Sequence, residues 1–205
     1  MQLTKGAIGN LINRYKAVLK KCHLLNVFGS LAVAGMLVMG GAAAAGAATD
    51  WTDKEISNQE ISKDGSYLLG GFINNTSWNM EAEELKNTKF LENKITITDN
   101  YLQGGIIKNT YNANLEITSS EFSKNTITAG GNYLQGGIIN NDGASVNISE
   151  GSKFNNNIIS ADSYLQGGII NNNDGIITIY GAEFSENRIS ASDFLQGGII
   201  INDGI

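Results

Sequence analysis

An apolar and polar pattern recurs along the chain from residue 67 onwards. Each copy opens on an aromatic residue, continues as Leu-Gln-Gly-Gly and ends on two isoleucines, as in Tyr164–Ile170. The first copy, Tyr67–Ile73, departs from it at Leu69 and Phe72. The opening aromatic lies at residues 67, 101, 133, 164 and 194, which are 34, 32, 31 and 30 residues apart. A nearly fixed period of this size is typical of repeat proteins, in which one structural unit stacks on the next.

A second motif, Phe-x-x-Asn, follows each of the first four copies. It begins at Phe90, Phe122, Phe154 and Phe184. The distance from Gly-Gly to this phenylalanine varies, whereas the distance from the phenylalanine to the next aromatic residue is nearly constant. This asymmetry predicts one tolerant loop per unit, on one side of the stack.

The fourth copy predicts the elements of one unit. Leu165–Asn171 has the composition of a strand, and Asn171–Gly175 is a turn signal. Ile176–Tyr180 alternates apolar and polar residues like a half-buried strand, and a third short strand runs from 184 to 190. Three short strands closed by turns make one coil, so the sequence predicts an all-β protein with the fold of a parallel β-helix (a β-solenoid).

Stacking of coils about 4.8 Å apart places identical side chains over one another. Ile, Leu and Phe are then expected to fill a dry interior, and glutamine and asparagine to form hydrogen-bonded ladders along the axis. The paired glycines predict a sharp corner or a close backbone approach. A ligand-binding stripe is the alternative role for each ladder. The predicted ladders are Gln103, Gln135, Gln166 and Gln196, and Asn93, Asn125, Asn157 and Asn187.

The N-terminal segment has the layout of an extended secretory signal peptide. A basic region of about 22 residues precedes an apolar core, Leu24–Met39, and an alanine-rich tail that ends at Ala48. A transmembrane anchor is the alternative, since residues 24–48 are long enough to span a bilayer. The predicted organisation is therefore a signal peptide at 1–48, an N-terminal cap or transition at 49–66, and about four and a half β-helix repeats at 67–205. Cys22 and His23 lie in the signal, so the mature chain has no disulfide.

Charge is distributed unevenly along the 205 residues. The chain has 14 basic and 20 acidic residues, and five of the basic residues but no acidic residue lie in the first 49 positions. The remainder therefore carries 9 − 20 = −11 charges. This acidic body argues against a nucleic-acid partner, because phosphate binding requires clustered lysine and arginine.

Gly-Gly-x-Ile paired with Phe-x-x-Asn at this spacing resembles the repeats of chlamydial polymorphic outer membrane proteins. Those are autotransporters, secreted by the type V route, whose passenger forms a right-handed β-helix and serves in adhesion. The family has alanine after Gly-Gly, whereas this chain has the residues Phe72, Ile106, Ile138, Ile169 and Ile199. The resemblance covers residues 67–205 and implies a related passenger outside the core family, with one coil per repeat of about 30–34 residues.

The resemblance implies an exported, non-catalytic adhesin or structural stalk, at the bacterial cell surface, in the outer membrane or outside the cell. Its expected partners are a host-cell or matrix receptor and a C-terminal outer-membrane β-barrel translocator beyond Ile205, so we expect the sequence to be a piece of a longer protein. No cofactor is implied.

A β-helix polysaccharide lyase or hydrolase is the alternative function, and it needs a base or a pair of carboxylates. Arg188 is the one arginine after the signal, at a position that other copies fill with Lys94, Thr126 or Ile158. Glu81, Glu83 and Glu84 form an acidic cluster that we expect in a solvated loop. No catalytic, cofactor-binding or metal residue is assigned.

Two further features bear on binding. Asp142, Asp174 and Asp203 lie in or near Asn-Asp-Gly, which Asx turns explain without calcium. We expect the stacked ladders to belong to the core, so that specificity lies between Gly-Gly and Phe, where the copies differ. The first of these segments is the longest and carries Trp78, the residue predicted to contact a partner. These segments are residues 74–89, 108–121, 140–153 and 171–183.

Overall fold

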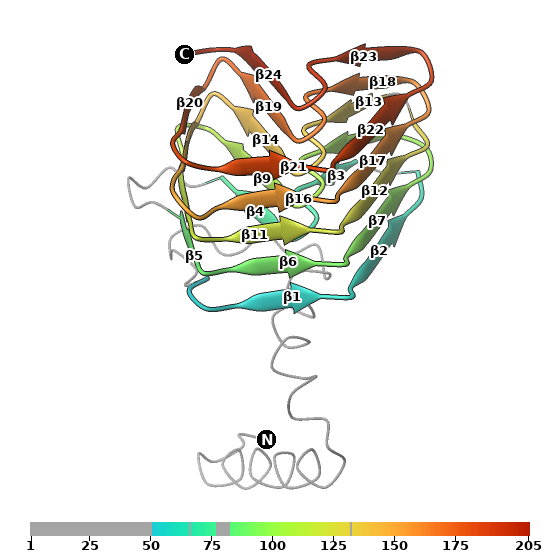
Figure 1. Cartoon of the computed structure of the whole chain (residues 1–205). Coiled ribbons are helices and arrows are strands. Elements are labelled where there is room, and N and C mark those ends of the chain that lie inside the picture. The colour runs from blue at the N-terminus through green and yellow to red at the C-terminus, as the bar shows by residue number, and fades with distance from the viewer. Residues whose placement is uncertain (1–50, 66, 77–82, 132) are drawn as a thin grey trace, which may run out of the picture.

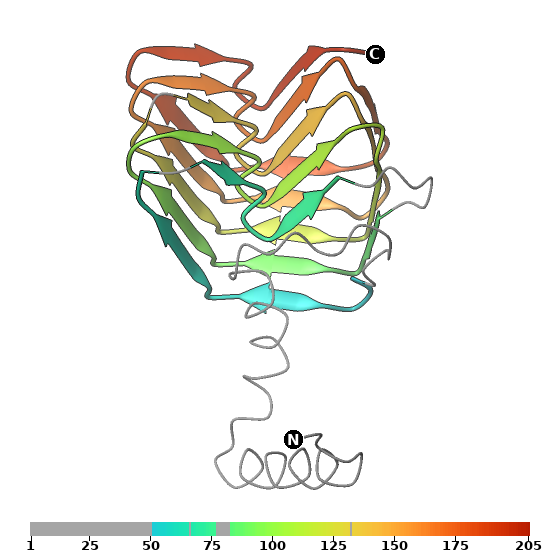
Figure 2. The same ribbon diagram turned by 180° about the vertical axis from the view of Figure 1, so that it is seen from behind.

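The computed structural model describes residues 51–65, 67–76, 83–131 and 133–205, and the predicted signal peptide lies outside them. The described residues form 24 strands and no helix. They make four coils of five strands and four strands of a fifth coil (Figures 1 and 2). Strands of successive coils pair in parallel and in register, which confirms the predicted parallel β-solenoid. Across the described residues, no helix is long and apolar enough to cross a membrane.

Five parallel sheets, here called A to E in the order in which the chain visits them, form the walls of the solenoid. Sheet A contains β1 (Glu55–Ser57), β6 (Lys89–Leu91), β11 (Glu121–Ser123), β16 (Lys153–Asn155) and β21 (Glu183–Ser185). Sheet B contains β2 (Glu60–Lys63), β7 (Lys94–Ile97), β12 (Thr126–Ala129), β17 (Ile158–Ala161) and β22 (Arg188–Ala191). Sheet C contains β3 (Leu68–Leu69), β8 (Tyr101–Gln103), β13 (Tyr133–Gln135), β18 (Tyr164–Gln166) and β23 (Phe194–Gln196). Sheet D contains β4 (Ile73–Asn75), β9 (Ile107–Thr110), β14 (Ile139–Asp142), β19 (Ile170–Asn173) and β24 (Ile200–Asp203). Sheet E contains β5 (Glu83–Lys86), β10 (Asn114–Thr118), β15 (Ser145–Ile148) and β20 (Ile176–Ile179).

Each complete coil has five strands, where the sequence predicts three. Residues 165–171, predicted as one strand, are divided between β18 and β19. The chain turns at Gly167, whose φ of +60° is one that residues with a side chain rarely adopt. The predicted turn at 171–175 is also shorter than expected, because β19 runs to Asn173 and buries Asn172.

Both glycines of the pair are required, for different reasons. A Cβ on Gly104 would lie 1.9 Å from the carbonyl oxygen of Ile107 in the same coil, and the residue has a φ of +64°. A Cβ on Gly105 would lie 2.2 Å from the carbonyl oxygen of Gly137 in the next coil. The first glycine therefore permits the corner within a coil, and the second permits the close approach between coils. The two expected roles of the pair are both confirmed.

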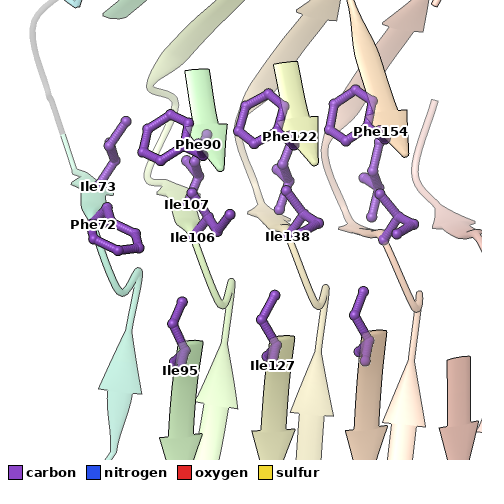
Figure 3. Close-up of a cluster of buried hydrophobic side chains, with 14 of the residues drawn as sticks. Phe72, Ile73, Phe90, Ile95, Ile106, Ile107, Phe122, Ile127, Ile138 and Phe154 are labelled. Atoms are coloured by element: carbon purple, nitrogen blue, oxygen red, sulfur yellow. The ribbon is translucent and has the colours of Figure 1, made fainter. Parts of the chain in front are cut away.

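The core consists of columns of identical side chains. Phe90, Phe122 and Phe154 are fully buried and lie in one row, above rows of isoleucine that include Ile106 and Ile138 (Figure 3). The phenylalanine rings stack with centroids 5.2 and 4.7 Å apart, and Phe184 continues the row at 4.8 Å. The predicted interior phenylalanine column is therefore confirmed. Burying a side chain of this size stabilises the fold by about 1.5–3 kcal/mol.

The asparagine of Phe-x-x-Asn holds the corner between sheets A and B. Asn125 donates from Nδ2 to the carbonyl oxygen of Phe90 at 2.8 Å and to Oδ1 of Asn157 at 3.0 Å. Its own Oδ1 accepts the main-chain N–H and the Nδ2 of Asn93. The residue before this asparagine has a positive φ in every copy, for example +56° at Lys124. The predicted asparagine ladder is confirmed, and its side chains satisfy a backbone that turns sharply.

A second asparagine ladder, in sheet D, was not predicted. It joins Nδ2 of Asn75 to Oδ1 of Asn109 at 2.8 Å and Nδ2 of Asn109 to Oδ1 of Asn141 at 2.8 Å, and continues through Asn172 to Asn202. These side chains point into the core, where an unpaired amide would be costly. The described residues contain no buried side-chain nitrogen or oxygen without a hydrogen-bond partner.

Residues before 67 already belong to the stack. Strands β1 and β2 pair with β6 and β7, and Ile56 takes the place of phenylalanine beneath Phe90. Trp51 is buried, and its ring lies 6.2 Å from that of Phe90. The stretch assigned from sequence to a cap or transition therefore includes two strands of the first coil.

Candidate functional site

The outward face of sheet C repeats nearly the same side chains from one coil to the next. Strand alternation directs the leucine of each Tyr-Leu-Gln into the core and the tyrosine and glutamine outward. Leu134 is fully buried, whereas its neighbours Tyr133 and Gln135 are partly exposed. We call this surface the aromatic–amide stripe. It consists of Tyr67, Tyr101, Tyr133, Tyr164 and Phe194, together with Gln103, Gln135, Gln166 and Gln196.

The aromatic rings of the stripe stack on one another along the solenoid axis. The centroids of Tyr67 and Tyr101 are 5.3 Å apart, those of Tyr101 and Tyr133 are 5.2 Å apart, and those of Tyr133 and Tyr164 are 4.9 Å apart. Phe194 is tilted by 48° against Tyr164. The rings cover each other's faces, so the column presents its edges and its phenolic hydroxyls to solvent.

The glutamines form the amide half of the stripe. Nε2 of Gln103 donates to Oε1 of Gln135 at 2.6 Å, Gln135 to Gln166 at 3.0 Å, and Gln166 to Gln196 at 3.3 Å. The predicted glutamine ladder is therefore confirmed. Each primary amide has two N–H groups, and the ladder uses one of them. The second remains available on the surface of the protein.

The expectation that stacked ladders belong to the core is wrong for sheet C. Tyr67 is 58% and Tyr164 40% exposed, although the column to which they belong repeats as regularly as the interior phenylalanines. The coil spacing sets the repetition inside and outside alike. Repetition along the sequence therefore indicates that residues stack in successive coils. The alternation of polar and apolar residues within a strand indicates which of them face solvent.

The segments predicted to carry specificity are only partly loops. Each contains a strand of sheet D and a strand of sheet E, and the copies differ in length in the turns on either side of sheet E. Trp78 and Glu81 lie outside the described residues. Glu83 and Glu84 belong to β5 rather than to a solvated loop, and Oε1 of Glu83 accepts a hydrogen bond from Nε1 of Trp51.

Lys108 is a buried cation beside the stripe. Sheets C and D meet in a V at the Gly-Gly corner (Figures 1 and 2), and Lys108 belongs to β9 of sheet D. The side chain is 8% exposed, and its Nζ donates to Oε1 of Gln103 across the corner. Burial lowers the pKa of Lys108 from 10.5, and the charge of Asp142 opposes this shift. The row to which Lys108 belongs holds Asn140 and Asn171 in the next coils.

The structure does not bring the other candidate residues together. Arg188 lies on the outer face of sheet B, in register with Ile158. Asp142 and Asp203 are in one column of sheet D, but Asn173 separates them, and Nδ2 of Asn173 donates to Asp142 at 2.9 Å. Asp174 lies in the turn after β19 with a φ of +49°. Among the described residues, no group of three or more His, Cys, Asp or Glu side chains is placed to hold a metal ion.

The outer face of sheet A differs chemically from the stripe. Its column alternates acidic and basic residues from one coil to the next, and the paired strands place opposite charges beside each other. Two ion pairs cross between coils at other positions, Lys94 with Glu60 at 2.9 Å and Lys124 with Glu92 at 3.2 Å. The outer column of sheet A is therefore charged, whereas the side chains of the stripe are uncharged. The charged column is Glu55, Lys89, Glu121, Lys153 and Glu183.

No protein-family model matches this chain, and a search of curated proteins and of solved structures gave no significant match.

Proposed function

We propose that this chain is the exported β-helix passenger segment of an autotransporter, acting as a surface-exposed adhesin or structural stalk without catalytic activity. The observation that carries the proposal is the aromatic–amide stripe. It repeats the same outward side chains in successive coils, and an extended repetitive surface suits attachment better than chemistry at a single point.

Two features of the sequence support the route of export. The order of basic, apolar and alanine-rich segments in residues 1–48 is that of a signal peptide. The alternating Gly-Gly-x-Ile and Phe-x-x-Asn motifs resemble those of autotransporter passengers. On this proposal a β-barrel translocator is encoded beyond Ile205, and the partner of the passenger is a host-cell or matrix surface.

The interior is suited to a stalk. Phenylalanine, isoleucine and asparagine columns continue from coil to coil, and the buried amides pair with neighbours along the axis. Each coil therefore supports the next, and the solenoid resists bending without disulfides. This property serves a protein that must hold a binding surface away from a membrane.

Export and adhesion can be tested separately. The full-length gene is expressed in a bacterium with two membranes, and protein recovered outside the cytoplasm is sequenced from its N-terminus. The mature chain is expected to begin between Ala45 and Asp50. The recovered protein is then applied to cultured epithelial cells and to immobilised matrix. An intact Met1 retained in the inner membrane contradicts export, and an absence of binding to cells and matrix contradicts the adhesin but leaves the stalk.

A further inference from the structure

We propose that the aromatic–amide stripe binds a linear, neutral polysaccharide laid along the solenoid axis. This inference rests on the proposed adhesive function and names the class of ligand. It also assigns binding to side chains that recur from coil to coil rather than to the segments in which the coils differ.

Charge selects an uncharged ligand. The stripe consists of phenols, amides and one phenyl ring. The chain after residue 49 carries a net charge of −11, from 9 basic and 20 acidic residues. A polyanion would be repelled by this body, and the side chains of the stripe include no cation to pair with it. Lys63 contacts the stripe at its first residue alone, where its Nζ donates to the main-chain oxygen of Tyr67 at 3.1 Å. The nearby ammonium of Lys108 is covered and donates to Gln103. A neutral polymer meets no such penalty.

The groups on the stripe suit a ligand rich in hydroxyls. The described structure gives the hydroxyls of Tyr67, Tyr101, Tyr133 and Tyr164 no hydrogen-bond partner, and each glutamine keeps at least one N–H outside its ladder. A phenol both donates and accepts, and an amide N–H donates. The ring faces are covered by neighbouring rings. Recognition by ring edges and hydroxyls is therefore expected, rather than stacking of a sugar on a ring face.

The repeat of the stripe fits a repeating ligand. One phenol and one amide recur in the second, third and fourth coils, whereas the first coil supplies a phenol alone and the fifth an amide alone. The centroids of successive tyrosine rings are 4.9–5.3 Å apart. This spacing is comparable with the advance of one sugar unit in an extended chain. Stacking and the amide ladder already fix these side chains, so little conformational entropy is lost on binding. Successive weak contacts along one chain then add, and affinity rises with ligand length.

The test uses purified full-length protein and defined glycans. Affinities are measured for β-1,4-glucan, β-1,3-glucan, β-1,4-mannan and β-1,4-N-acetylglucosamine oligomers, from disaccharides to about six units. Polygalacturonate and heparan sulfate serve as the anionic comparison. The expected result is binding of at least one neutral series, with affinity that increases with length, and weaker binding of both polyanions.

The decisive variant is Tyr101→Phe combined with Tyr133→Phe. It removes two hydroxyls but leaves the rings, and Phe194 already occupies the same column. The loss of two ordinary hydrogen bonds should weaken binding about tenfold. Tyr180→Phe is the matched control, because Tyr180 is 68% exposed and lies outside the stripe. Melting temperatures of all three proteins should agree, so that lost binding is not lost folding.

Several outcomes overturn the inference. They are binding of no neutral series, affinity independent of length, preference for a polyanion, and equal binding by the double variant. Self-association that depends on the two tyrosines, measured by sedimentation without glycan, also overturns it and assigns the stripe to a second copy of the chain. If the protein still adheres to enzymatically deglycosylated cells, and the double variant adheres equally well, the stripe does not bind a glycan, whereas the proposed adhesive function stands. Glycan binding by a protein that is not exported refutes only the proposed function.

Discussion

Two columns of stacked aromatic rings run along the solenoid, one inside and one outside. Centroid spacings are 4.7–5.2 Å in the phenylalanine column and 4.9–5.3 Å between the tyrosines. Yet Phe90, Phe122 and Phe154 are fully buried, whereas Tyr67 is 58% exposed. The same coil spacing therefore produces equal stacking in opposite environments. What differs is the free energy that each column contributes, and this difference can be measured.

The interior column should be the more costly to interrupt. Phe154→Ala removes a ring packed between Phe122 and Phe184 and leaves a cavity that the neighbouring coils cannot fill. We expect the free energy of unfolding to fall by about 3–5 kcal/mol, measured by denaturant titration. A loss below about 1 kcal/mol would place this ring outside the core and contradict the fold.

The two amide ladders allow the same comparison between a buried and an outer column, here for polar side chains. Asn125→Leu leaves the buried main-chain N–H of Asn93 without its acceptor and removes the donor to the carbonyl of Phe90. Each buried group left unsatisfied costs about 1–3 kcal/mol, so we expect a loss of about 2 kcal/mol or more.

Gln135→Leu is the matched change on the outer surface. Water can satisfy the partners that it leaves, and leucine already fills this column at Leu69. A loss within about 1 kcal/mol is expected in the same denaturant titration. Equal losses in Asn125→Leu and Gln135→Leu would show that burial does not set the strength of these ladders.

The period of the sequence was sufficient to predict the solenoid, its register and the interior phenylalanine column. It did not predict the number of strands, because Gly167 and Gly168 divide a stretch of continuous strand composition through their backbone geometry. It also missed the buried ladder through Asn141 and Asn172, because asparagine beside Asp-Gly has the composition of a turn.

The candidate binding surface was missed for a different reason. The long period predicts that stacked ladders belong to the core and leaves a ligand-binding stripe as their alternative role, although Tyr133-Leu134-Gln135 alternates polar and apolar residues and places only Leu134 inside. The signal that could have found the stripe was therefore local. The alternation extends over a strand of only three residues, so it is easily overlooked beside the repeat of 30–34 residues.

The outer ring column should contribute a modest stability of its own. Tyr133→Ala removes two stacked contacts, with Tyr101 and Tyr164, each worth about 0.5–1.5 kcal/mol. We expect a loss of about 1–2 kcal/mol in the same titration, less than for Phe154→Ala. Tyr180→Ala, at a more exposed tyrosine outside the stripe, should stay within about 0.5 kcal/mol of the parent. If Tyr133→Ala lowered the free energy of unfolding as much as Phe154→Ala, the inner and outer columns would contribute equally to stability, contrary to this prediction.

Lys108 tests the boundary between inside and outside, because it projects from the outer face of sheet D and is nevertheless buried. Burial lowers its pKa in the folded chain below the 10.5 of the unfolded chain. Below the folded-state pKa both states hold the proton, and the cost of burying the charge is present in full. Between the folded-state pKa and 10.5 the unfolded chain binds more protons, so stability rises with pH, and above 10.5 the cost of burying the charge is gone.

Lys108→Met keeps the aliphatic stem without the charge, so the stability of this variant relative to the parent should be greatest near neutral pH and should decline towards pH 10.5. Thermal melting of both proteins across this range measures the difference, and other titrating groups cancel between them. A difference that grows with pH would show that the ammonium of Lys108 stabilises the corner through Gln103 rather than straining it.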